Sequence, residues 1–366
     1  MSNEIAIPTT KIKYRNPIEH LAFWQVLGHP GEFPFPDGVR HALVIDCGDM
    51  EALSSKDDEF LTKIRRFVQD QDSHDVDLIR IRGTHPGDLP NESTWKALDG
   101  LRPRHLELLA GLDESADITP LDSLETPWPL ESLCIVDVCQ DLVTKHLWSV
   151  SRLTLYYMCR TSLILPEDYI IKGPSALLHF TCIGNDAYPM LTQWRNTDMS
   201  SIIDNLESLR LESSSGMDFG RYTYPEFVQF LHNCIALKSL DLVLSQSLTV
   251  SASLSEEPEQ DEHYRNLDRY LIDLPKYLPP SLVQLKIRSI ADSAQYIGVW
   301  LDCARNPDWL PRLQSVSLRY DLPVRDPDQG EKPPLSPSRS EGTELLEDFY
   351  QALALRNPSV ERIISS

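Results

Sequence analysis

The stretch that decides the fold is LESLRL at Leu206–Leu211, in which apolar residues stand at the first, fourth and sixth places. The same spacing returns as LKSLDL at Leu237–Leu242 and as LVQLKI at Leu282–Ile287. Three further clear copies begin at Leu130, Val150 and Leu313, and looser copies begin at Val39, Val76, Pro103, Leu177 and Val360. A short apolar phrase that recurs about every 20–29 residues indicates stacked supersecondary units rather than an ordinary globular domain.

The phrase predicts an α/β leucine-rich-repeat solenoid. In such a fold each unit contributes one strand to a curved parallel sheet on the concave face, and helices or irregular connections cover the convex face. No single unit buries its apolar side alone, so the core comes from stacking. Helical apolar spacing between the copies predicts helices over residues 56–69, 224–233, 263–278, 293–304 and 343–355.

The intervals between copies indicate one array with two insertions. Several neighbouring copies begin 27 residues apart, but two intervals near the carboxyl end are much longer. The first holds residues 245–262, which are serine-rich and then acidic, and the second holds residues 323–342, which are rich in Pro and Ser. We interpret both segments as inserted loops. Residues 37–366 then form the repeat array, and residues 1–36, which lack the phrase, form an irregular amino-terminal cap.

Composition indicates a folded intracellular protein. The 366 residues are 41% hydrophobic and carry a formal net charge of −21, which disfavours binding to nucleic acid. The seven cysteines are scattered and odd in number, as expected for reduced thiols. The sequence has neither a membrane-length apolar run nor a secretory signal at its amino terminus. We therefore expect no membrane association and a cytoplasmic or nuclear location.

The phrases NLESLRLESS, ALKSLDLVLS, SLVQLKIRSI and LPRLQSVSLRY resemble the irregular leucine-rich repeats of the ribonuclease-inhibitor-like superfamily. They are most similar to the repeats of fungal F-box proteins, in which an early strand often follows a phrase like FPDGVRHALVID at Phe35–Asp46. That resemblance implies a protein-binding surface and, in the ligase members, a substrate receptor. Residues 1–36 contain no recognisable F-box, and the asparagine usual after the last leucine of each repeat is missing.

The register of the phrase assigns side chains to the concave face. Alternate strand residues point to opposite faces, so the neighbours of the fourth and sixth residues face away from the core. Of roughly thirty such positions, eight are basic and three acidic, whereas the overall composition gives about three and about five. This inversion predicts that arginine forks on the face bind an acidic or phosphorylated segment of a protein partner. The candidate partner-binding residues are Arg80, Arg82, Arg152, Tyr156, Arg210, Lys286, Arg288 and Arg319, and Arg362 is a further basic position.

Three functional classes remain open from the sequence. The favoured one is a non-enzymatic protein-interaction module without cofactor or metal, because the chain lacks the nucleophile-elbow, phosphate-loop, dinucleotide and HExxH motifs. The alternatives are a ubiquitin-ligase substrate receptor and an enzyme or accessory factor of unrecognised chemistry. An alternative interpretation of the concave face is that its arginines pair only with neighbouring acidic side chains. The polar cluster of His74, Asp75 and Asp77 is interpreted as a turn before a strand rather than a metal site.

Overall fold

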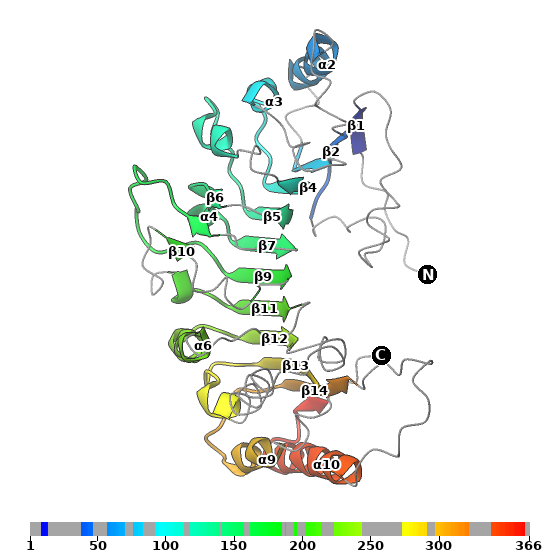
Figure 1. Ribbon diagram of the computed structural model, residues 1–366, viewed down its shortest axis with the longest axis vertical. Coiled ribbons are helices and arrows are strands. Elements are labelled where there is room, and N and C mark those ends of the chain that lie inside the picture. Colours follow the sequence, from blue (N-terminus) through cyan, green and yellow to red (C-terminus); the bar gives the residue numbers. More distant parts are fainter. Residues whose placement is uncertain are drawn as a thin grey trace, which may run out of the picture. The chain divides into compact units, whose positions relative to one another are not determined.

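The fold is known from a computed structural model. It describes residues 9–13, 38–46, 57–69, 76–82, 92–112, 118–138, 141–156, 162–184, 187, 194–195, 202–213, 223–243, 273–290, 297–321 and 338–362. The chain divides into two compact units, the first comprising residues 1–177 and 194–197 and the second residues 178–193 and 198–366. Both are α/β units built on a parallel sheet, so the expected fold class is confirmed at this level (Figure 1).

Unit 1 contains a parallel sheet in the order β1-β2-β3-β4-β5-β7. Its strands are β1 (Thr9–Lys13), β2 (Ala42–Asp46), β3 (Leu78–Arg82), β4 (His105–Leu112), β5 (Ser132–Val138) and β7 (Arg152–Tyr156). A second, small parallel sheet joins β10 (Trp194–Arg195), β8 (Leu163–Ile164) and β6 (Leu142–Val143). The connections contain α2 (Asp57–Gln69), α3 (Glu92–Ala97), the 3-10 helix η3 (Thr119–Ser123) and α4 (His146–Ser149). The described part of the predicted irregular cap, residues 9–13, is the strand β1.

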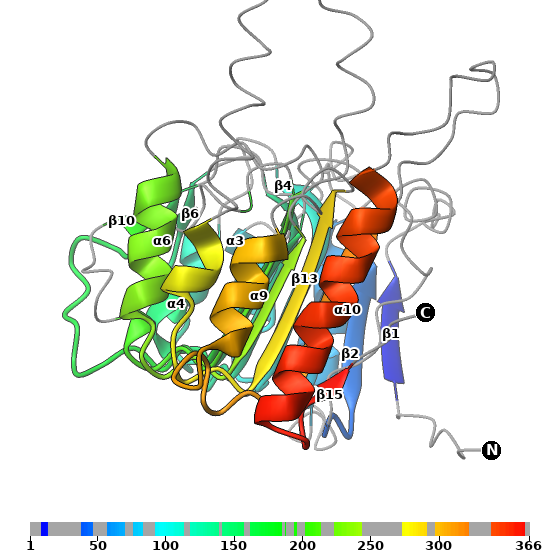
Figure 2. The ribbon, with the colours of Figure 1, turned by 90° about the horizontal axis from the view of Figure 1, so that it is seen from below.

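Unit 2 repeats this plan of parallel strands with connecting helices. Its parallel sheet runs β9 (His179–Gly184), β11 (Ser208–Ser213), β12 (Ser239–Val243), β13 (Gln284–Ile290), β14 (Ser315–Asp321) and β15 (Glu361–Arg362). Between the strands lie α6 (Thr223–Asn233), the 3-10 helix η5 (Leu274–Tyr277), α9 (Ile297–Arg305) and α10 (Ser338–Arg356). In Figure 2 the axes of α6, α9 and α10 run along the strands.

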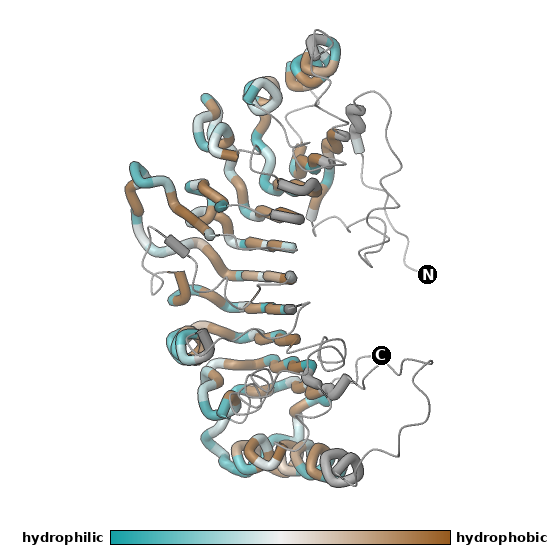
Figure 3. The backbone as a smooth tube through the Cα atoms, viewed as in Figure 1, coloured by the Kyte–Doolittle hydropathy of each residue, from teal (hydrophilic) through white to brown (hydrophobic). Residues whose placement is uncertain are grey.

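Strand alternation places the leucines of the phrase in the core. The fourth and sixth residues of the clear copies are buried, as Leu209 with Leu211 and Leu240 with Leu242 illustrate. The first residue of each clear copy is buried as well, just before its strand begins. Hydrophobic residues accordingly gather along the strands (Figure 3). The prediction of core positions from the six clear copies is confirmed.

One backbone contact recurs at the start of the strands. The carbonyl of the residue before one strand accepts the N–H groups of two residues at the start of the next. Asp77 O accepts from Arg104 N at 2.9 Å and His105 N at 3.0 Å, and Glu207 O accepts from Lys238 N and from Ser239 N at 2.8 and 2.9 Å. Because these bonds use only main-chain atoms, they hold neighbouring copies in register whatever side chains the copies carry.

The predicted register was wrong by one residue at both ends of the array. Leu43 pairs with Ile79, so the first copy begins at Arg40 and not at Val39. Val316 pairs with Arg362, which moves the start of the last copy from Val360 to the residue before it. At both ends the main-chain contact just described sets the pairing, and an apolar residue one place away misled the sequence pattern.

The shift at the carboxyl end also moves Arg362 off the predicted concave face. Its guanidinium forms a two-pronged ion pair with Glu347 of α10, at 2.8 and 2.9 Å, and lies 4.1 Å from the ring centroid of Tyr350. The Tyr350 hydroxyl in turn accepts the Leu318 N–H at 2.9 Å. Arg362 therefore fastens the last strand to α10.

The predicted helices 56–69 and 224–233 are confirmed as α2 and α6, and those at 293–304 and 343–355 correspond to α9 and α10. Helix α9 buries Ile297, Trp300, Leu301 and Ala304, which share one face at helical spacing. The helix predicted at 263–278 is described only near its end, where η5 stands. The loop predicted at 245–262 lies outside the described residues, and α10 begins within the last residues of the loop predicted at 323–342. No helix among the described segments is both long and apolar enough to cross a bilayer.

Candidate functional site

The candidate site is the sheet surface opposite the leucines of the phrase, which we call the opposite face. Cross-strand pairing arranges its side chains in rows. In unit 1 the middle row contains Val44, Arg80, Glu107 and Cys134. In unit 2 one row contains Arg210, Asp241, Lys286 and Ser317, and the next contains Glu212, Val243, Arg288 and Arg319. The two units differ in how accessible these rows are.

In unit 1 the opposite face is buried around Arg80. Arg80 is 4% exposed and Glu107 5% exposed. Arg80 Nε donates to Glu107 Oε2 at 2.5 Å. Burial raises the pKa of the Glu107 carboxyl, while the charge and hydrogen bond of Arg80 act to lower it. The role of Arg80 in partner binding stays a prediction; in this structure its guanidinium is buried and ion-paired, so it presents little surface to a partner.

The neighbouring row of unit 1 runs from Arg82 through Leu109 and Val136 to Tyr156, and its middle is apolar. Leu109 and Val136 are buried, and the half-buried Cys134 and Tyr156 pack against them. Burial raises the pKa of the Cys134 thiol, so this cysteine stays protonated and unreactive. Arg152 is exposed at the start of β7, and Arg82 occupies the end of β3, where its side chain lies outside the described part. Among the described side chains of unit 1, the predicted residues Arg80, Arg152 and Tyr156 do not form one charged cluster.

In unit 2 two predicted arginines converge on one carboxylate. Arg210 Nη2 donates to Glu212 Oε2 at 3.0 Å, and Arg288 Nη2 donates to the same oxygen at 3.3 Å. Alternation along β11 brings Arg210 and Glu212 to one face. Arg288 reaches Glu212 across the intervening strand β12, where Val243 occupies the same row. We call Arg210 and Arg288 the arginine fork.

The arginine fork stays open to solvent. The side chains of Arg210 and Arg288 are 43% and 30% exposed, and that of Glu212 is 23% exposed. Asp241 lies beside the fork, its Oδ2 atom 3.9 Å from Arg210 Nε. Lys286 follows in the same row and is half-buried, with no ion pair to any side chain in the described part of the chain. Arg319 is the cross-strand neighbour of Arg288 on β14, and its side chain lies outside the described part.

Sequence reasoning placed the basic residues on this face and named pairing with neighbouring acids as an alternative, without specifying which acid pairs with which arginine. The signal was present, since Arg210 and Glu212 stand two residues apart on one strand and therefore share a face. The interpretation that strand arginines pair with neighbouring acids holds for Arg80, Arg210 and Arg288. It does not hold for Lys286 of unit 2, which makes no ion pair with any described side chain.

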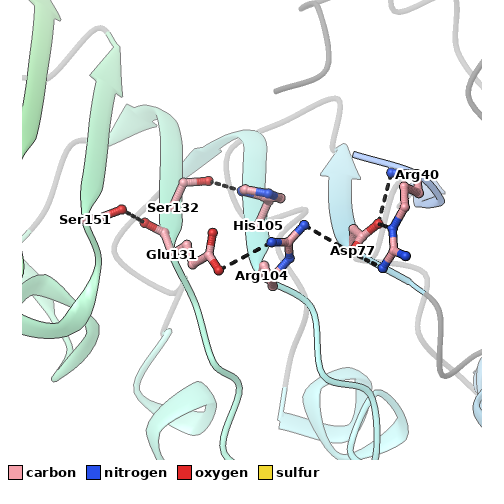
Figure 4. Close-up of polar contacts among 7 residues, drawn as sticks. All are labelled: Arg40, Asp77, Arg104, His105, Glu131, Ser132 and Ser151. Carbon is pink, nitrogen blue, oxygen red and sulfur yellow. Dashed lines mark hydrogen bonds and ion pairs between the residues drawn. The ribbon is translucent and has the colours of Figure 1, made fainter. Parts of the chain in front are cut away.

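A second polar line, which sequence reasoning missed, crosses the strand starts of unit 1 (Figure 4). Asp77 accepts from the Arg40 N–H at 2.9 Å and from Arg40 Nε at 3.3 Å, and Arg104 lies 3.5 Å from both Asp77 and Glu131. Burial acts to raise the pKa of Asp77, but the Arg40 hydrogen bonds and the charges of Arg40 and Arg104 hold it below its usual value. Asp77 therefore has a structural role. It lies just before β3, where a turn was predicted, and it belongs to a series of ion pairs that links neighbouring strands.

A cavity of about 550 Å³ lies between α3 and η3 in unit 1. Asp99, which lines it, accepts N–H groups from Gly100, Glu125 and Thr126 at 2.9–3.0 Å. Lys96 at its edge is paired with Glu92 at 2.6 Å. These groups are committed to the turn and the helix, so the cavity has no convergent set of catalytic side chains among its described lining.

Ser149, His146 and Asp122 align in the order of a hydrolytic triad, but the geometry does not suit catalysis. His146 Nδ1 is 3.5 Å from Ser149 Oγ, and His146 Nε2 is 3.6 Å from Asp122 Oδ1. Asp122 already accepts from Thr144 Oγ1 at 2.8 Å and from the Lys145 N–H at 2.9 Å. Burial, with a contribution from Lys145, lowers the pKa of His146 to about 4, which makes it a weak base near neutral pH. In this cluster His146 is buried, whereas Ser149 is exposed.

Comparison with known proteins adds no assignment. No family model matches the chain, and no curated protein matches it.

Proposed function

We propose that this protein is an irregular leucine-rich-repeat solenoid, similar to the repeat region of fungal F-box proteins, that acts in the cytoplasm or nucleus as a non-enzymatic interaction module. The parallel strands, the repeated main-chain contact at their starts and the buried first, fourth and sixth residues of each clear copy support the repeat architecture. A stacked sheet of this kind leaves one face for binding.

The partner surface is the opposite face of unit 2, and the partner presents an acidic segment there. The single observation that carries this proposal is the arginine fork, because its two guanidinium groups are directed at one carboxylate while both remain accessible to solvent. Guanidinium groups hold carboxylates through charge-assisted hydrogen bonds. Lys286 adds a third basic group, in the same row as Arg210. The whole chain carries a formal net charge of −21, so this local basic cluster contrasts with an acidic protein surface.

Affinity capture with a triple variant tests the proposal. The full chain and the variant R210Q/K286Q/R288Q are compared with a control, K63Q/K96Q/K276Q, which removes the same charge from three exposed helical or 3-10 positions. We expect partners that the full chain and the control retain and the triple variant loses. Equal recovery by all three proteins would refute binding on this face. Recovery of a ubiquitin-ligase adaptor by all three would instead favour the substrate-receptor alternative.

A further inference from the structure

The arginine fork is already filled by a side chain of the protein itself. Glu212 stands on the same strand as Arg210 and across one strand from Arg288, and its Oε2 atom accepts from both guanidinium groups at 3.0 and 3.3 Å. All three side chains are partly exposed, so water and an incoming group reach the same site. An acid held between two arginines in this way occupies the position that a partner carboxylate would take.

Partial exposure decides whether Glu212 can be exchanged. Removing one member of a buried ion pair leaves an uncompensated charge in a medium of low polarity, which is costly. An exposed pair separates with little loss, because water solvates each charge as it is released. The fork falls in the second class, whereas the Arg80–Glu107 pair of unit 1, with side chains 5% and 7% exposed, falls in the first.

We propose that Glu212 is an internal competitor that occupies the arginine fork, and that a partner binds by placing a carboxylate of an acidic peptide segment where the Glu212 carboxylate now lies. The proposal rests on the proposed function and names its chemistry: the ligand is an extended acidic peptide, read by Arg210 and Arg288. Glu212 then lowers the affinity for every ligand, because a ligand binds only by displacing the Glu212 carboxylate. A weakly acidic segment does not displace that carboxylate.

The variant E212Q isolates this role, because it removes the competing charge and keeps the size of the side chain. The probe is a fluorescein-labelled hexaglutamate peptide, with hexaglutamine as the uncharged comparison, measured by fluorescence anisotropy at low salt. The matched control is E207Q, which removes the same charge from the same repeat but breaks the Glu207–Lys238 pair, outside the fork. Circular dichroism of each variant checks that the fold is intact.

We expect E212Q to bind hexaglutamate roughly tenfold more tightly than the unaltered chain, since a like charge next to the bound carboxylate has been removed. E207Q should bind as the unaltered chain does, and E212Q/R288Q should lose the gain. Equal affinity of E212Q and E207Q, with binding still weakened by R288Q, would overturn the competitor role and leave the proposed function standing. Absence of hexaglutamate binding in the unaltered chain and in E212Q alike would overturn both.

Discussion

His146 gives the sharpest test of how this fold depends on pH. It is the first residue of α4 and is 3% exposed, and its Nε2 atom makes no hydrogen bond within the described part of the chain. Asp122 at 3.6 Å would favour the imidazolium, but burial outweighs it and lowers the pKa of His146 to about 4. The imidazole is therefore buried in its neutral form.

The sign of the effect follows from the two pKa values. The pKa of His146 falls from 6.5 in the unfolded chain to about 4 in the folded one, so acid protonates the unfolded chain first. The contribution of the neutral His146 to the free energy of unfolding is therefore fully present above about pH 6.5, and it is lost as the pH falls from there toward 4. The full difference corresponds to about 3 kcal/mol, of which about 2 kcal/mol is lost by pH 5.

Urea unfolding at pH 7.5 and pH 5, followed by circular dichroism, measures this loss in the unaltered chain, H146Q and H232Q. Other groups titrate in the same range, so the informative quantity is the difference between proteins in the pH-dependent change. We expect that change to be about 2 kcal/mol smaller in H146Q than in the unaltered chain. His232 is exposed on α6, and H232Q should behave as the unaltered chain. A pH dependence in H146Q equal to that of the unaltered chain would refute the buried neutral imidazole.

Two further predictions concern the stability of unit 1, both measured by urea unfolding at pH 7.5. R80M should lower the free energy of unfolding by about 3 kcal/mol, because it leaves Glu107 buried without its partner, and R80M/E107L should recover part of that loss. An R80M protein as stable as the unaltered chain would contradict a buried pair. G100A should lower the free energy of unfolding by about 1–2 kcal/mol, because Gly100 has φ +102° and an added Cβ would lie 3.3 Å from Val68 Cγ1. In the control G298A, in α9, the added Cβ meets no atom within 4 Å, so this variant should be neutral or stabilising. Equal effects of the two substitutions would count against strain at Gly100.

The core could be predicted from the sequence because one repeated phrase carries the same physical information many times. Each copy places an apolar residue before the strand and two on its inner face, and six clear copies agree on the register. At Val39 and Val360 the apolar pattern gave a register one residue away from the one in the structure. There the hydrogen bonds of main-chain atoms determine the pairing, and side-chain hydrophobicity does not encode them.

The opposite face could be predicted only in part. Alternation along a strand states which side chains share a face, and it correctly grouped Arg210 with its neighbours on β12 and β13. It does not state what packs over that face, so Arg80 and Arg288 looked equivalent in the sequence. Burial separates them, because one guanidinium lies in an almost closed environment and the other remains in contact with water.

That separation explains how one residue pattern can serve two purposes. Arg80–Glu107 and Arg288–Glu212 are both arginine–glutamate pairs formed between strands of a parallel sheet. Desolvation makes the first pair costly to open, so it can only hold unit 1 together. Solvent access makes the second pair cheap to open, so its arginine is available to another carboxylate. Among the basic residues on these sheets, the exposure of the ion pair, rather than the presence of the arginine, therefore decides whether the guanidinium is accessible to another carboxylate.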